Sequence, residues 1–159
     1  MRTSIRRAGA ILAALAAITA VTAPVGASSP EPISITSQMT IPFDAPSTGF
    51  FQADPSDLIC PTGTVLDLGV IGAGFQSGRG GQILVLKELT CDDGSGTIFV
   101  RLAVHFRDGG QGGVPTGSFT WVIVGGTGDY ADLQGRGTGI GVSTGPNSVT
   151  DTYTGFLIG

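Results

Sequence analysis

Few side chains of this chain have the type and the spacing that binding or proton-transfer chemistry needs. His105 is the only histidine, so any imidazole base or metal ligand must be this residue. Arg101 lies four positions earlier on the same side of an alternating segment, and Glu88 is an acid that can oppose it on a neighbouring strand. We take Arg101, His105 and Glu88 as candidates for holding the polar end of a ligand, with Trp121 as an aromatic wall.

Each candidate also has a plainer interpretation. Trp121 packs equally well in a core with Phe119 and Ile123, and His105 can lie on a strand surface or at a subunit contact. Which strand face lines the interior is not readable from alternation. If the aliphatic side chains of residues 98–106 fill the interior, Arg101 and His105 lie outside, and the pattern favours this arrangement. Asp67 and Arg136 are further charges that an interior could hold.

Metal, cofactor and nucleophile chemistry find no support in the remaining residues. One histidine and two cysteines that we expect to be bridged do not supply the three or four ligands of a zinc site, so no metal and no cofactor is expected. Residues 92–96, Asp-Asp-Gly-Ser-Gly, predict a hairpin turn rather than a calcium loop, because the alternating oxygen ligands and the closing glutamate are missing. No catalytic residue is identified.

The N-terminal segment predicts export. Arg2, Arg6 and Arg7 precede an uncharged, alanine-rich run over residues 8–21, and Val25-Gly26-Ala27 offers the small residues that signal peptidase reads. We expect a signal peptide over residues 1–27, a flexible lead over 28–32 and a single domain over 33–159. The run is too short and too interrupted for a membrane anchor. The paired arginines leave the export route, Sec or twin-arginine, undecided.

The charge balance limits the partners. Removing the three arginines of residues 1–27, which carry no acid, takes the net charge from −4 to −7. A chain this acidic has no positive surface for a phosphate backbone, so we expect neither nucleic acid nor, after cleavage, a membrane as partner. In an exported chain, the two cysteines, Cys60 and Cys91, are most simply a structural disulfide.

Alternation with a period of two predicts an all-β domain. Residues 97–106 are the clearest strand, since Ile98, Val100, Leu102 and Val104 fall on one face. About eight short strands are separated by turn residues, which is typical of a sandwich or a barrel. The further strands are expected at 33–41, 49–52, 62–71, 82–90, 118–124, 135–142 and 148–158.

One motif invites a different fold. Trp121 to Val124 followed by Gly125-Gly126-Thr127-Gly128 resembles a strand that feeds a phosphate-binding turn. A dinucleotide fold needs a helix after those glycines. Residues 129–134 leave space for little more than one turn before the next glycines, so we expect a single helical turn or a bulged corner with glycine at positive φ.

The C-terminal third carries a family resemblance. Gly117-Ser-Phe-Thr-Trp121, Gly125-Gly-Thr-Gly-Asp-Tyr130-Ala131, Leu133-Gln-Gly135 and Thr152-Tyr-Thr-Gly155 resemble the allene oxide cyclase-like and dirigent-like barrels, most closely secreted bacterial members. The resemblance implies an eight-stranded antiparallel, up-and-down, calycin-like barrel with a central cavity, assembled as a homodimer or homotrimer. It implies a small apolar ligand whose cyclisation or coupling the barrel steers. The alternative is a non-catalytic secreted barrel that acts as a binding or structural module.

Overall fold

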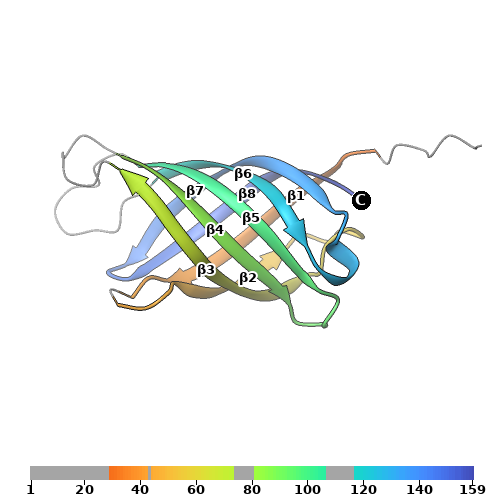
Figure 1. Cartoon of the computed structure of the whole chain (residues 1–159), viewed down its shortest axis with the longest axis horizontal. Helices are drawn as coiled ribbons and strands as arrows, with labels where there is room; N and C mark the ends of the chain where they lie inside the picture. The colour runs from red at the N-terminus through yellow and green to blue at the C-terminus, as the bar shows by residue number, and fades with distance from the viewer. Residues whose placement is uncertain (1–28, 43, 74–80, 107–116) are drawn as a thin grey trace, which may run out of the picture.

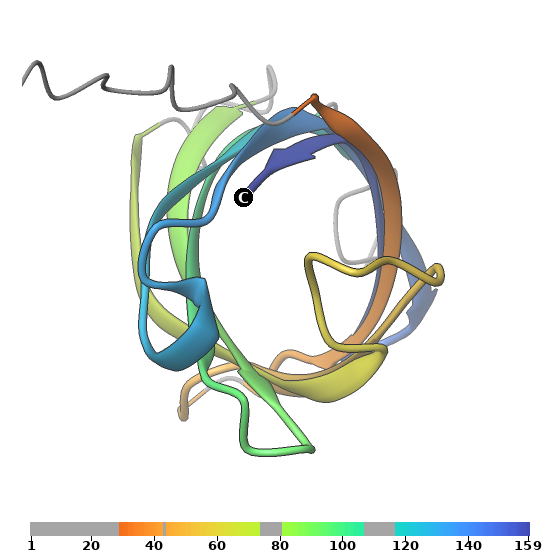
Figure 2. The ribbon, with the colours of Figure 1, turned by 90° about the vertical axis from the view of Figure 1, so that its right-hand side faces the viewer.

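The protein is a closed barrel of eight antiparallel strands in chain order (Figures 1 and 2). This computed structural model describes residues 29–42, 44–73, 81–106 and 117–159. The expected signal peptide, the first residue of the expected lead and residues 108–113, whose glycine-rich sequence predicts a loop, lie outside them. The predicted fold class, an eight-stranded antiparallel barrel with one disulfide, is confirmed. Among the described residues, no helix is long and apolar enough to cross a membrane.

The strands lie close to the predicted ranges. The fifth and the eighth strands have the predicted bounds, and the others extend the predicted ranges by one to three residues at one or both ends, except that the first ends one residue early. The first strand begins at Glu31, two residues before the expected domain start. The strands are β1 (Glu31–Thr40), β2 (Thr48–Ala53), β3 (Thr62–Ala73), β4 (Gly81–Cys91), β5 (Thr97–Phe106), β6 (Gly117–Gly126), β7 (Gln134–Gly145) and β8 (Ser148–Ile158).

The interior is aliphatic at β5, which answers the question that alternation left open. Ile98, Val100 and Leu102 are buried, whereas Arg101 and His105 are exposed on the outer wall. The strand pairing carries this alternation around the barrel, because opposed residues on paired strands point to the same side. The inward row opposite Leu102 includes Val85 on β4 and Trp121 on β6.

Strand β7 turns glycine toward the interior at four alternate positions, and large rings from the neighbouring strands fill the space. Gly137 and Gly139 oppose Trp121 and Phe119 on β6. A Cβ atom added at Gly137 would lie 2.8 Å from Trp121 Nε1. The ring of Tyr153 on β8 then packs edge-on against Phe119, with centroids 4.9 Å apart. The glycine-rich repeat therefore provides the lumen volume that these aromatic side chains occupy.

The Gly-Gly-Thr-Gly motif forms a corner between antiparallel strands. After β6 the chain makes a single 3₁₀ turn, Gly128–Tyr130, with Gly128 at a φ of 60°, and then enters β7, which pairs antiparallel with β6. No crossover helix separates the two strands, so the phosphate-binding interpretation is excluded and the predicted corner is confirmed.

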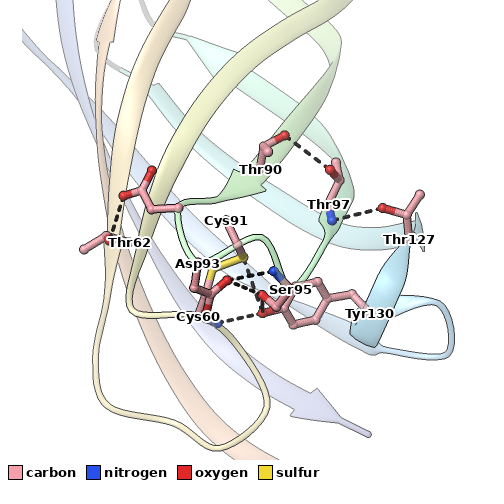
Figure 3. Close-up of a disulfide and its surroundings, with 10 residues drawn as sticks. Cys60, Thr62, Thr90, Cys91, Asp93, Ser95, Thr97, Thr127 and Tyr130 are labelled. Carbon is pink, nitrogen blue, oxygen red and sulfur yellow. Dashed lines mark hydrogen bonds between the residues drawn. A yellow bond between two sulfur atoms is a disulfide. The ribbon is translucent and has the colours of Figure 1, made fainter.

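The disulfide closes this end of the barrel (Figure 3). Cys60, in the segment between β2 and β3, is bonded to Cys91 at the end of β4, as predicted. Tyr130 Oη accepts a hydrogen bond from Cys60 N (3.1 Å) and lies 2.7 Å from Ser95 Oγ. The segment from 54 to 61 folds across the mouth of the barrel at this end (Figure 2). The 92–96 segment is the expected turn, in which Asp93 accepts hydrogen bonds from Ser95.

Candidate functional site

The most unusual feature of the lumen is a buried cluster of charges. Lys87, the only lysine of the chain, is 5% exposed and points inward from β4. Its Nζ lies 2.8 Å from Asp67 Oδ1 on β3 and 3.5 Å from Asp151 Oδ2 on β8. Three ionisable groups therefore meet inside an otherwise apolar barrel, where an unpaired charge would be very costly.

The Lys87–Asp151 pair spans the lumen. Asp67 is the direct cross-strand partner of Lys87. Strand β8, by contrast, is four steps from β4 in either direction around the closed barrel, so it forms the opposite wall. The lysine side chain is long enough to bring its ammonium group to a carboxylate on that wall. The ion pair thus connects the two sides of the barrel and crosses the lumen.

Two buried hydroxyl groups beside this cluster form no hydrogen bond of ordinary geometry, although Tyr153 faces both Ser37 and the Asp151 carboxylate. Ser37 Oγ and Tyr153 Oη are both buried, at 1% and 3% residue exposure. Ser37 opposes Asp151 across the β1–β8 pairing, and Tyr153 lies two residues further along β8. Buried polar groups are nearly always hydrogen-bonded with good geometry, so two poorly bonded hydroxyls beside a charge cluster need an explanation.

Burial shapes the protonation of the cluster. It raises the pKa of the Asp151 carboxyl, an effect opposed by the positive charge of Lys87 and reinforced by Asp67. Burial, together with the charge of Asp151, raises the pKa of the Tyr153 phenol well above its usual value. Tyr153 is therefore neutral and able to donate a hydrogen bond. Asp151, whose pKa burial raises, is the group that can accept a proton.

Local backbone features position these side chains. A bulge between Asp67 and Gly69 follows directly after the aspartate on β3, so the inward phase of that strand shifts by one residue, from Asp67 to Val70, which opposes the buried Val85. Opposite Asp151, β7 carries Gly141, where an added Cβ would lie 2.8 Å from Asp151 Oδ1. The absent side chain leaves the space that the carboxylate occupies.

The predicted site residues are not brought together in the lumen. Arg101 and His105 are exposed on the outer face of β5, and Glu88 lies half-buried on the outer face of β4. They do not line the lumen, because they fall in the opposite phase from the buried aliphatic side chains; this is the arrangement that the alternation favoured. Trp121 does lie inside, donating hydrogen bonds from Nε1 to the carbonyls of Thr138 (3.1 Å) and Thr154 (3.2 Å). Of the two further charges that the interior could hold, Asp67 lies in the lumen and Arg136 lies on the outer face.

The lumen cluster was missed although the sequence carries a signal for it. Lys87 stands at the alternate position between Val85 and Leu89, in phase with buried apolar residues. Asp151 stands in the same way between Val149 and Tyr153. A polar residue in phase with the apolar face of a strand points into the core, and this rule identifies both charges.

A hollow of about 350 Å³ lies at the disulfide end and has several acidic residues in its wall. Asp57, Asp93, Asp129 and Asp132 contribute to its wall, next to Tyr130. Within the described parts of the chain, no group of three or more histidine, cysteine or acidic side chains has the geometry to hold a metal ion. The acidic hollow therefore offers no built metal site.

Comparisons with protein-family models, with curated proteins and with solved structures gave no match for this chain.

Proposed function

We propose that this protein is a secreted barrel that binds a small, mostly apolar molecule in its lumen and holds the molecule's polar group at Ser37, Lys87 and Tyr153. The observation that carries the proposal is the pair of buried hydroxyls, neither with a hydrogen bond of ordinary geometry, beside a cross-lumen ion pair. A bound polar atom would satisfy both hydroxyls, and the aromatic and aliphatic wall would contact the apolar remainder. The resemblance to allene oxide cyclase-like and dirigent-like barrels supports the same use of the lumen.

The cluster favours a neutral oxygen over an anion. Tyr153, Ser37 and Lys87 can all donate hydrogen bonds toward one acceptor. The two carboxylates outnumber the single ammonium group, so the ionised cluster has a net negative charge and repels a carboxylate ligand. A ketone, an ether or an alcohol matches this environment. Asp151, whose pKa burial raises, is the acid–base group that a conversion of the bound molecule would use.

The test is a titration with a panel of neutral cyclic ketones and alcohols, each matched with the carboxylate of the same ring size. Trp121, the only tryptophan, reports binding by its emission, because its ring centroid lies 6.3 Å from that of Tyr153. We expect a saturable change with a neutral member and a weaker one with its carboxylate. The Tyr153→Phe variant removes one of these two hydroxyls and should lose about tenfold in affinity, as for one hydrogen bond.

Thr152→Val is the matched control, since it removes a hydroxyl from the outer face of the same strand. It should bind as the unchanged protein does. Equal affinity in Tyr153→Phe, or no saturable response to any neutral member, overturns the proposed site. A preference for the carboxylates overturns the assignment of a neutral ligand.

The second candidate is a non-catalytic secreted barrel that acts through its outer surface. It is favoured by the filled part of the lumen, where Phe119, Trp121 and Tyr153 pack against one another. This candidate predicts that no ligand of the panel changes the emission of Trp121 and that any partner binds the outer wall.

A further inference from the structure

Three neighbouring strands give the outer wall of the barrel a face rich in hydroxyl and amide groups. Strands β8, β1 and β2 turn mostly threonine, serine and glutamine outward. Phe50 on β2 and Phe156 on β8 are the only aromatic side chains at these outward positions, and they are 56% and 55% exposed. A single exposed ring does not by itself mark a contact surface. Each of these two rings, however, lines a groove in the wall.

The groove beside Phe50 has a volume of about 430 Å³ and crosses β1, β2 and β3. Phe50 lies directly opposite Gln38 on β1, and Gln52 lies directly opposite Thr62 on β3. The carboxylate of Asp92 completes this side of the groove and accepts a hydrogen bond from Thr62 Oγ1 (2.8 Å). One exposed ring thus stands in a groove whose other exposed side chains are all polar.

The polar groups of this groove have unused hydrogen-bonding capacity. In the described part of the chain, neither the Gln38 nor the Gln52 side-chain amide has a partner. Each amide offers two N–H donors and one carbonyl acceptor, and the Asp92 carboxylate has a second oxygen besides the one that Thr62 contacts. A ligand dense in hydroxyl groups, which both donate and accept, matches this mixture of donors and acceptors.

Charge and shape narrow the class of ligand. Asp92 is the only charged residue that lines the groove, and the chain has a net charge of −4, so a chain of phosphates or carboxylates is repelled. A pyranose ring with equatorial hydroxyls presents C–H groups on its faces and hydroxyls at its edge. Its face packs flat on an aromatic ring while its edge reaches the neighbouring polar side chains.

We propose that this face binds a neutral polysaccharide of β-linked, glucose-type sugar units. Phe50 is the platform for one unit, and the amides of Gln38 and Gln52 bond its hydroxyls. The proposal goes beyond the lumen site and uses none of the polar groups of that site.

The second groove, at Phe156, explains why the ligand is a chain and not a single sugar. This groove has a volume of about 870 Å³ and is lined by threonines of β6, β7 and β8 as well as by the ring. Phe50 opposes Gln38 and Phe156 opposes Pro32, which are six residues apart on β1. The two rings therefore lie roughly 20 Å apart along that strand, a span that only several linked sugar units can cover.

Depletion of the protein from solution by microcrystalline cellulose and by chitin tests the proposal. At least one of the two polymers should bind the protein saturably. Phe50→Ala should weaken binding about tenfold, because the platform is lost, whereas Phe50→Trp should retain it. Gln52→Leu keeps the size of the side chain but removes the amide, and it should weaken binding about fivefold.

Ile71→Ala is the matched control, because it removes a 76% exposed apolar side chain of β3 that lines neither groove. It should bind as the unchanged protein does. The urea midpoint of each variant, followed by the emission of Trp121, shows that the variant is folded. The lumen variant Tyr153→Phe should also bind the polymer unchanged, so the lumen site and the outer face can fail separately.

Four results would overturn the proposal. The first is no saturable binding to either polymer, and the second is equal binding by Phe50→Ala and the unchanged protein. The third is an equal loss in Ile71→Ala, which would assign the binding to general apolar adsorption. The fourth is a preference for polygalacturonate over both neutral polymers, which would contradict the charge argument.

Discussion

Replacing Lys87 by methionine tests the cross-lumen ion pair by leaving its two carboxylates without a counter-charge. Methionine has a similar length and fits the apolar surroundings, so the change removes charge with little loss of packing. Asp67 and Asp151 then face each other as buried anions. Removing one partner of a buried ion pair costs about 3–5 kcal/mol.

The predicted loss is large on the scale of domain stability. With a urea dependence of about 2 kcal/mol per molar, it shifts the unfolding midpoint down by roughly 2 M urea at pH 7. Urea unfolding followed by the emission of Trp121 measures the shift. Arg136→Met, which removes an exposed cation from the outer face of β7, is the matched control and should change stability by at most about 0.5 kcal/mol.

The loss should also depend on pH with a definite sign. Without Lys87, the positive charge that opposes the effect of burial is gone, so the folded-state pKa of the Asp151 carboxyl rises further above its unfolded-state value. Between the two values the folded state binds more protons, so the variant gains stability as the pH falls. The difference in urea midpoint between Lys87→Met and the unchanged protein should therefore decrease from pH 7 toward pH 4.

Two results would refute this reasoning. One is a Lys87→Met protein as stable as the unchanged chain at pH 7. The other is a loss of equal size at pH 7 and pH 4, which would assign the effect to packing. If Lys87→Met does not fold at pH 7, the triple variant with Asp67→Asn and Asp151→Asn should fold again, because it removes the uncompensated charges.

Three further predictions follow from the same structure. In the unchanged protein, burial raises the folded-state pKa of Asp151, so its stability relative to Asp151→Asn should increase as the pH falls toward the ordinary aspartate range; a flat difference in urea midpoints between pH 7 and pH 4 contradicts this. The double variant Cys60→Ala/Cys91→Ala should lose about 3–4 kcal/mol of folding stability, on the chain-entropy estimate for two cysteines 31 residues apart. An unchanged melting temperature would show that the disulfide does not stabilise the fold. Gly137→Ala should cost at least about 1–3 kcal/mol, because the new methyl group overlaps the backbone carbonyl oxygen of Thr154 and also crowds Trp121; Gly69→Ala, with no atom within 4 Å of the added Cβ, should be close to neutral and is the control.

The fold was largely predictable because its strands alternate cleanly and end at glycine-rich or polar turns. In β5 the alternation identified the strand, and its aliphatic phase favoured the face that is buried. Likewise, the short interval between Gly128 and Gly135 excluded a crossover helix. The bulges at Leu68 and Val124 were not predictable, since they shift the register by a single residue without a sequence marker.

The candidate site was harder to predict because the search began from chemically reactive residue types rather than from strand phase. His105 and Arg101 attracted attention, yet their phase places them on the outer wall. Lys87 and Asp151 are in phase with buried residues, but only the closed barrel shows that their strands form opposite walls. That cross-lumen contact depends on strand number and order, and local sequence does not contain it.

The most direct test of the buried cluster is the reactivity of its lysine. Lys87 is the only lysine, so the ε-amine of Lys87 and the N-terminal amine are the only primary amines of the chain. Acetylation of the native protein followed by mass spectrometry should modify the N-terminus alone, and Lys87 should react only after unfolding in urea. Modification of Lys87 in the native protein at the rate of the N-terminal amine would contradict its place between Asp67 and Asp151.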